Sequence, residues 1–278
     1  MKRRDFNIGL LSAMSGALLA QNASASDTAS ASASDPSQAA GHKHSDATPT
    51  KRPTYNMLVH PNMILLDLVA PMTAFKLTMG DVRLVWKDTN PVPTDVGVPV
   101  SATHTFDNCP GDADVLFVPG GLTGSTALVE DDETLDFLRQ QAKSAKYVTS
   151  VCTGSMVLGA AGFLNGKRAT SHWYTRDLLS YFGAIPTSQR VVEDGNIITG
   201  AGATAGLDFG LTIAARIKGD EWVKKMMLTL EYAPEPPFKG GTPETATPEN
   251  VKDILTIRGP KIEKASQAIQ RAAKKMGV

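Results

Sequence analysis

The chain has 278 residues, of which 42% are hydrophobic, and it carries 28 basic and 28 acidic residues. This length and apolar content suffice for a globular domain with a buried core. The balanced charge gives no overall field toward nucleic acid or anionic lipid, so we expect no nucleic-acid partner. A small, uncharged organic substrate is the expected ligand.

The first 25 residues have the layout of an export signal. Basic residues precede a short apolar run, and small residues follow at Ala23 and Ala25. The run is too short to span a membrane, so we expect no stable membrane insertion after signal removal. Arg3 and Arg4 resemble the start of a twin-arginine signal, which exports folded proteins, and they predict a periplasmic location. An ordinary secretory signal is the alternative interpretation.

Residues 26–53 are rich in Ser, Ala, Asp and Thr and poor in large apolar side chains, which predicts a disordered leader. His42 and His44 are potential metal ligands within it, although histidines in such a segment are more often solvated. We expect residues 54–278 to form a single domain that ends in a helical tail. No internal repeat is evident.

From residue 55 onward, short apolar runs alternate with helical patterns, which is typical of a parallel sheet covered by helices on both faces. The pattern predicts strands at residues 55–59, 82–86, 113–118 and 147–151, and a hairpin at residues 191–198 around Asp194-Gly195. It predicts helices at residues 70–79, 125–146, 153–164, 205–216, 221–232 and 261–275. The sequence therefore predicts an α/β fold.

Cys152 lies where the predicted strand at 147–151 meets the start of a helix. A residue on so sharp a turn projects its side chain away from the sheet, and the helix N-terminus is expected to lower the pKa of its thiol. The main-chain N–H of Thr153 is a candidate donor to a developing negative charge. Cys152 is thus a candidate nucleophile. The alternative is a buried core cysteine, which is common for this residue type.

The other cysteine, Cys109, lies in a loop-like segment. An even number of cysteines in an exported protein favours pairing. A crosslink to Cys152 would block a thiol at a strand-to-helix junction, where an exposed thiol is useful. We therefore expect both thiols to remain free.

Two further segments supply candidate site residues. Pro119-Gly120-Gly121 follows a predicted strand, and its glycines permit close approach of the main chain to a ligand, although the segment could equally be a turn. Asp67 is a single acid inside an apolar run that precedes a helix. It is either the cap of that helix or a proton donor and acceptor with a raised pKa that faces Cys152.

Three other features have alternative interpretations. The glycine-rich segment 200–206 is similar to a dinucleotide-binding fingerprint, but its last glycine is one residue too far along, so we interpret it as helix packing. His172 is either the base of a Cys-His pair or a structural residue beside Trp173. Glu231 is either a second carboxylate of the pocket or a solvated helix end.

Together these residues resemble the ThiJ/PfpI superfamily, which has a class I glutamine amidotransferase-like domain, and within it the isocyanide hydratase branch. The resemblance covers roughly residues 56–248 and rests on the segments 150–155 (SVCTGS), 168–173 (RATSHW) and 230–232 (LEY), together with Asp67 and Pro119-Gly120-Gly121. It implies a flavodoxin-like three-layer sandwich with a cysteine on a strained nucleophile elbow. It also implies that the protein needs no cofactor and is commonly a homodimer.

The resemblance further implies a reaction. In the hydratases a thiolate attacks the terminal carbon of an isocyanide and an aspartate handles the proton and the water, which gives an N-substituted formamide. By position, the catalytic residues are Cys152 as nucleophile, Asp67 as general acid and base, and Thr153 as the neighbour that orients the site. The substrate-binding candidates are Gly120, Gly121 and His172, although the hydratases do not need a histidine.

Several alternatives to the hydratase remain open. One is a related thiol hydrolase or glyoxalase-like enzyme that uses the same cysteine, and another is a non-catalytic stress-response or ligand-binding protein. Sensor domains of some transcription regulators share the Thr-His-Trp run, but we find no segment here that suits DNA-binding helices. The predicted export signal is a departure from the resemblance, because the hydratases of this branch that we would compare are cytoplasmic.

Overall fold

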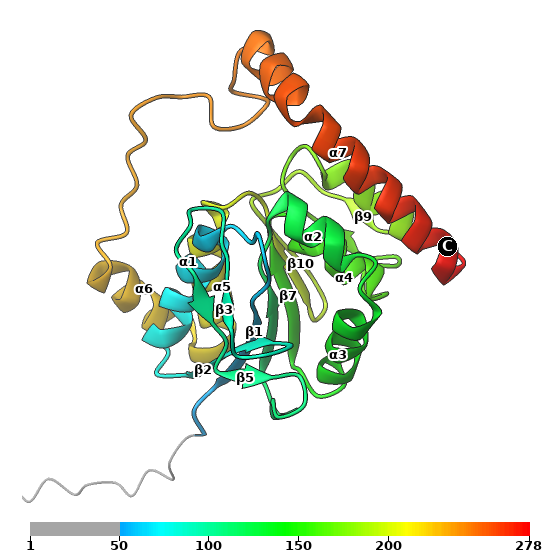
Figure 1. The fold of residues 1–278 in the computed structure, drawn as a ribbon. Helices are drawn as coiled ribbons and strands as arrows, with labels where there is room; N and C mark the ends of the chain where they lie inside the picture. The colour runs from blue at the N-terminus through cyan, green and yellow to red at the C-terminus, as the bar shows by residue number, and fades with distance from the viewer. Residues whose placement is uncertain (1–50) are drawn as a thin grey trace, which may run out of the picture. The chain divides into compact units, whose positions relative to one another are not determined.

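The structure is a computed structural model that describes residues 51–278. The predicted export signal, His42, His44 and nearly all of the predicted leader lie outside the described residues. Residues 51–278 contain a seven-stranded sheet in the order β10-β11-β7-β6-β1-β2-β5 (Figure 1). Its neighbouring strands run parallel except in the β10–β11 hairpin. The predicted α/β fold with a mostly parallel sheet is confirmed.

The strands of this sheet are β1 (Thr54–Leu58), β2 (Asp81–Trp86), β5 (His104–Thr105), β6 (Val115–Val118), β7 (Tyr147–Val151), β10 (Val191–Asp194) and β11 (Ile197–Gly200). Two smaller sheets pair β3 (Pro91–Val92) with β4 (Val100–Ser101) and β8 (Arg168–Ala169) with β9 (Ile185–Pro186). The central strands β1, β6, β7 and β11 are buried almost throughout, because helices cover both faces of the sheet. The predicted strands and the hairpin are present. The two-residue strands were not predicted, because so short a segment has no periodicity.

The helices form two layers (Figure 1). One face of the sheet carries α1 (Leu65–Leu77), α5 (Ala205–Lys218) and α6 (Asp220–Thr229). The other carries α2 (Leu122–Leu128), α3 (Asp132–Ala142), α4 (Gly154–Ala160), the 3-10 helix η1 (Arg176–Phe182) and α7 (Pro248–Met276). Within residues 51–278, no helix is both long enough and apolar enough to cross a bilayer.

Several helix boundaries differ from the prediction. Helix α1 begins at Leu65 rather than at residue 70, so Pro71 lies inside it. The helix predicted over residues 125–146 is two helices, because Asp131 caps α3 by accepting a hydrogen bond from the Thr134 N–H. Helix α4 ends at Ala160 rather than at residue 164.

Helices α1 and α5 pack closely because α5 carries glycines at the contact. A Cβ atom on Gly210 would lie 2.8 Å from Cβ of Ala74, and one on Gly206 would lie 3.3 Å from Cδ of Pro71. Neither position has room for a larger side chain without a shift of α1. The interpretation of the glycine-rich segment as helix packing is confirmed, and this contact fixes α1 and Asp67 against the sheet.

Helix α7 begins at Pro248, well before the predicted start at residue 261, because Thr247 caps it and proline suits a first turn. Its C-terminal part buries Ala265, Ala268, Ile269, Ala272 and Ala273 against α2, α4 and η1. Ion pairs of Arg271 with Glu130 and of Lys275 with Asp132 add to this attachment. Residues 248–260 are mostly exposed and extend beyond the anchored part of the helix (Figure 1).

Candidate active site

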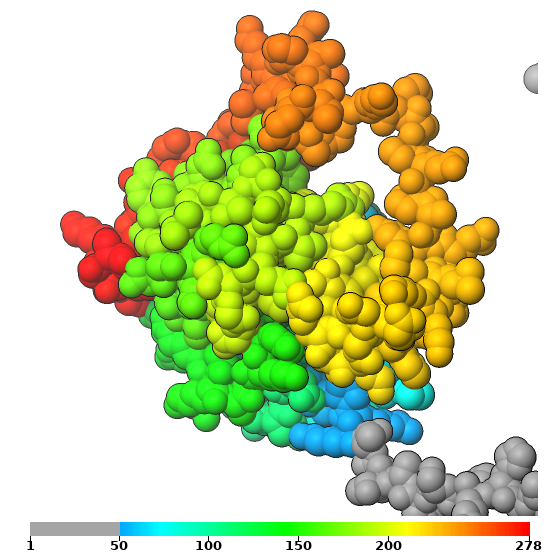
Figure 2. Space-filling model, turned by 180° about the vertical axis from the view of Figure 1, so that it is seen from behind, coloured from blue at the N-terminus to red at the C-terminus, as the bar shows by residue number. Residues whose placement is uncertain are grey.

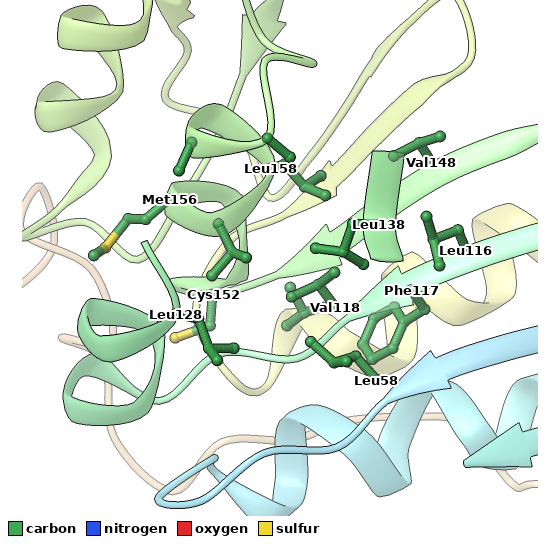
Figure 3. Packing of buried hydrophobic residues seen from close by; sticks show 14 of the residues in the cluster. Leu58, Leu116, Phe117, Val118, Leu128, Leu138, Val148, Cys152, Met156 and Leu158 are labelled. Carbon is green, nitrogen blue, oxygen red and sulfur yellow. The ribbon is translucent and has the colours of Figure 1, made fainter. Parts of the chain in front are cut away.

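Cys152 lies at the carboxyl end of β7, between that strand and α4, at the edge of the buried apolar core (Figure 3). Its φ angle is 57°, in the left-handed region that non-glycine residues rarely occupy. A strained backbone of this kind persists only where its surroundings hold it. The predicted sharp turn at Cys152 is therefore present in the structure.

Hydrogen bonds hold the Cys152 backbone on both sides. Its N–H donates to the carbonyl of Gly200 at 3.0 Å and to that of Ala201 at 2.7 Å. Its carbonyl accepts from the hydroxyls of Ser155 at 3.1 Å and Ser171 at 3.0 Å. The loop after β11 and the segment after β8 thus fix the position of the thiol. The two serines were not predicted as site residues, because a buried serine has no distinctive pattern.

Asp67 lies in the first turn of α1 and is completely buried. It does not cap the helix, because the N-cap is Ile64 and makes no side-chain cap bond. Its Oδ2 instead accepts a hydrogen bond from the Gly120 N–H at 3.1 Å. Its other oxygen, Oδ1, is buried with no hydrogen-bond partner among residues 51–278. That oxygen is free to exchange a proton.

Gly120 is the point at which the reactive groups converge. A Cβ atom at this position would lie 2.6 Å from Oδ2 of Asp67, 2.6 Å from the Thr153 nitrogen and 2.7 Å from Cβ of Cys152. Contacts that short do not occur in proteins, so only glycine lets the three groups come together. Three adjacent parallel strands, β1, β6 and β7, bring their carboxyl ends to this place.

Thr153 orients the neighbouring main chain. Its hydroxyl accepts a hydrogen bond from the Gly121 N–H at 2.8 Å and lies 2.9 Å from the hydroxyl of Ser125. The amides of Gly120 and Gly121 are thus engaged by the side chains of Asp67 and Thr153. The two glycines shape the site by allowing close packing.

The electrostatics of the Cys152–Asp67 pair differ from the prediction for the thiol. Burial and the negative charge of Asp67 raise the pKa of Cys152 well above its ordinary value, and the N–H of Thr153 offsets only part of this. The expected lowering of the thiol pKa by the helix start is wrong, because α4 is short and desolvation dominates. Burial likewise raises the pKa of Asp67 to about 7, although hydrogen bonding with Cys152 and Gly120 opposes the rise. Near neutral pH the pair therefore holds a proton.

A cavity of about 400 Å³ opens above Cys152. Its inner wall includes Ile64 and three consecutive aromatic side chains, His172, Trp173 and Tyr174. Its outer wall comes from the chain after α6, namely Gly240, Gly241, Thr242, Pro243, Ala246, Asn250, Val251, Ile254 and Arg258. Figure 2 shows this late segment standing away from the rest of the domain before it reaches α7. The volume suits a small organic molecule.

His172 shares this cavity with Cys152, but no hydrogen bond joins the two side chains within the described residues. Burial, with a smaller effect from the positive charge of Arg258, lowers the pKa of His172 to about 4. Its Nδ1 is buried with no partner among residues 51–278, and its ring lies 3.8 Å from that of Tyr174. The geometry therefore places His172 on the wall of the cavity and not beside the thiol.

Two other candidates lie outside the cavity. Glu231 is exposed at the end of α6, as the solvated alternative requires. Cys109 and Cys152 are both buried and form no disulfide in the structure. Within residues 51–278, no group of three or more His, Cys, Asp and Glu side chains is placed to hold a metal ion.

The DJ-1/PfpI family model matches residues 56–216. The chain belongs to the DJ-1/PfpI family. It is 48% identical over 222 residues to a protein named isonitrile hydratase from Pseudomonas putida, and the match covers 80% of this chain and 96% of that protein. The matched segment is longer than residues 56–248, so the similarity extends beyond the part of the chain that carried the resemblance.

Solved structures agree with this assignment. A ThiJ/PfpI family protein from Pseudomonas syringae superposes with a TM-score of 0.77 at 43% identity, over 82% of this chain and 98% of that one. Drosophila melanogaster DJ-1beta superposes with a TM-score of 0.61 at 24% identity, over 66% of this chain and 100% of that one, and shares the fold.

Proposed function

We propose that this protein is an isocyanide hydratase, which adds water to a small organic isocyanide and releases an N-substituted formamide. The observation that supports it most directly is the pairing of Cys152, on a strained elbow, with the buried carboxyl of Asp67. The similarity to the Pseudomonas putida isonitrile hydratase over nearly the whole of that protein supports the same conclusion.

The first chemical step uses the proton that the pair holds. The Asp67 carboxylate takes the proton of the Cys152 thiol and delivers it to the terminal carbon of the isocyanide while the sulfur of Cys152 adds to the same carbon. The product is a thioformimidate, R–N=CH–S–Cys152, and Asp67 is left as a carboxylate. The raised pKa of about 7 suits this role, because a general acid works best when its pKa lies near the working pH. The Thr153 N–H stabilises the negative charge that develops on the sulfur as the proton leaves.

The second step consumes the water. The Asp67 carboxylate takes a proton from water as the water oxygen adds to the carbon, and passes that proton to the nitrogen. The carbon–sulfur bond then breaks, the hydroxyl proton returns to Asp67, and R–NH–CHO leaves. Asp67 passes this proton to the sulfur, so the thiol of Cys152 and the carboxylate of Asp67 are restored, and the sum is one isocyanide and one water to one formamide.

We also propose that the mature protein is exported to the periplasm and forms a homodimer. The twin-arginine layout of residues 1–25 supports export, and the family resemblance supports the dimer. Cell fractionation of the tagged full-length chain tests the location, with recovery in the cytoplasm counting against it. Analytical ultracentrifugation of the mature protein tests the dimer, with a monomer at micromolar concentration counting against it.

The deciding experiment measures formamide release from a simple alkyl isocyanide by the mature protein. We expect turnover by the wild type, none by Cys152→Ala, and strongly reduced turnover by Asp67→Asn. Cys109→Ala, which removes the other buried thiol, is the matched control and should remain active. An inactive wild type would reject the hydratase, and turnover of methylglyoxal or a peptide instead would favour the glyoxalase-like or hydrolase alternative.

A further inference from the structure

Arg258 is a cation on the outer wall of the Cys152 cavity. It lies in the exposed first half of α7 and forms no ion pair or side-chain hydrogen bond with any residue in 51–278. The nearby ion pairs on α7 involve Arg271 and Lys275, which anchor the opposite end of the helix. Arg258 is therefore a guanidinium with its donors free at the mouth of a cavity that holds a reactive thiol.

The charge of Arg258 reaches the inner wall of the cavity. It contributes to the lowered pKa of His172, and it opposes the rise in the pKa of Tyr174. The pKa of Tyr174 also responds to the charges of Cys152 and Asp67, whereas Arg258 is not among the groups that shift Cys152. Arg258 lines the same cavity as Cys152, His172 and Tyr174, so it is placed to contact a substrate held there.

His172 presents a second donor to the same space. Its ring is neutral near pH 7, so one of its two nitrogens carries a hydrogen. Nδ1 is fully buried, so Nε2 is the ring nitrogen that a ligand in the cavity can reach. The amide of Asn250, on the same wall as Arg258, adds a further hydrogen-bonding group.

The shape of an isocyanide directs its substituent toward this wall. The C–N–R unit is linear, so a molecule whose terminal carbon meets the sulfur of Cys152 extends its substituent away from the sheet, into the cavity. Arg258, His172 and Asn250 all line that cavity. A guanidinium group together with neutral hydrogen-bond donors is well suited to bind a carboxylate.

We propose that Arg258, assisted by His172 and Asn250, binds a carboxylate on the substituent of the substrate, so that the preferred substrate is a small isocyanide acid. This inference rests on the proposed hydratase function. This departs from the uncharged substrate that the composition led us to expect: the reacting isocyanide group is uncharged, but the rest of the substrate carries a negative charge that faces α7. Arg258 is then a specificity residue.

The test compares isocyanoacetate with its methyl ester, which has nearly the same size and no charge. We expect the ratio of kcat/KM for the acid to kcat/KM for the ester to fall about tenfold or more in Arg258→Gln, the range for loss of a charge-assisted hydrogen bond. Lys252→Gln removes an equal charge from an exposed position of the same helix that does not line the cavity, and should keep the wild-type ratio. An unchanged ratio in Arg258→Gln would overturn the proposal.

A binding measurement separates this inference from the hydratase itself. Isothermal titration of N-formylglycine and of its methyl ester into the wild type and Arg258→Gln needs no turnover. We expect the wild type to bind the acid more tightly than the ester, with the preference lost in the variant and weakened at high salt. Equal affinity of the wild type for both compounds would reject the carboxylate site even if isocyanides are hydrated. Circular dichroism and melting temperature would verify that the variant is folded.

Discussion

The two sides of the Cys152 cavity are built differently. The inner side is the edge of a parallel sheet, where Cys152, Asp67 and Thr153 are buried and each is held by main-chain or side-chain hydrogen bonds. The outer side is the segment from Gly240 to Arg258, which is largely exposed. Proton transfer and bond formation need fixed geometry, whereas substrate selection tolerates a less constrained surface. In the proposed function, the sheet would therefore determine the reaction and the segment from Gly240 to Arg258 the choice of substrate.

The largest effect expected on the inner side is that of the nucleophile. Cys152→Ala should lower turnover of any isocyanide by at least about a thousandfold, because no other thiol among the described residues lines the cavity to replace it. Steady-state formamide production measures this. Residual activity within tenfold of the wild type would show that Cys152 is not the nucleophile.

Asp67→Asn should lower turnover by about a hundredfold or more, the contribution of a positioned acid and base. It should also stabilise the fold at high pH. The folded pKa of about 7 exceeds the ordinary 3.8, so the folded carboxyl keeps a proton that the unfolded chain has lost, and wild-type stability declines as pH rises from about 4 to 7. Asparagine removes this decline, which is on the order of 4 kcal/mol for a shift of that size.

Denaturant unfolding of wild type and Asp67→Asn at pH 4, 6 and 8 would test this stability difference. The gap in free energy of unfolding should widen with pH and level off above about pH 7. Asp107→Asn, at an exposed aspartate, should follow the wild type at each pH. A gap that is independent of pH would contradict a buried, raised carboxyl at position 67.

Gly120→Ala should lower kcat by roughly ten- to a hundredfold, because its methyl group must displace Asp67, Cys152 or the Thr153 main chain. It should also destabilise the fold by about 1–3 kcal/mol through overpacking. Gly111→Ala is the matched control, since a Cβ at Gly111 has no neighbour within 4 Å. Kinetics and thermal unfolding of both variants measure the contrast, and similar behaviour of the two would show that the site is not tightly packed at Gly120.

The smallest effect is expected on the outer wall. Ile254 lines the cavity and is 42% exposed, so Ile254→Ala should raise KM for a bulky alkyl isocyanide by about two- to fivefold and change kcat little. Ile257 is 70% exposed on the same helix and does not line the cavity, so Ile257→Ala should leave KM unchanged. A large fall in kcat for Ile254→Ala would show that the tail takes part in the chemistry.

The residues on the inner side of the cavity could be predicted from the sequence, because strong local patterns mark them. The apolar run of β7 ends directly at Cys152, and Gly120-Gly121 ends the adjacent strand. Asp67 was identified as an unusual acid within an apolar run, although the start of its helix was misplaced. Its hydrogen bond with Gly120 joins residues far apart in the chain, and only the tertiary structure reveals such a contact.

The outer wall was missed for an identifiable reason. Residues 248–260 form no part of the buried core, and Gly259-Pro260 interrupts the helical pattern. The spacing of Val251, Ile254 and Leu255 does suit one face of a helix and was a usable signal. The raised thiol pKa was also missed, because desolvation depends on the whole fold and not on the local turn.

The late position of the outer wall affects the order in which the protein becomes functional during synthesis. The sheet that carries Cys152 is complete once β11 has left the ribosome, but Arg258 and the anchoring residues of α7 are translated afterwards. At ordinary translation rates this interval lasts several seconds. If Cys152 and Arg258 have the roles proposed above, a nascent chain passes through a stage in which the nucleophile is assembled and the carboxylate site is not.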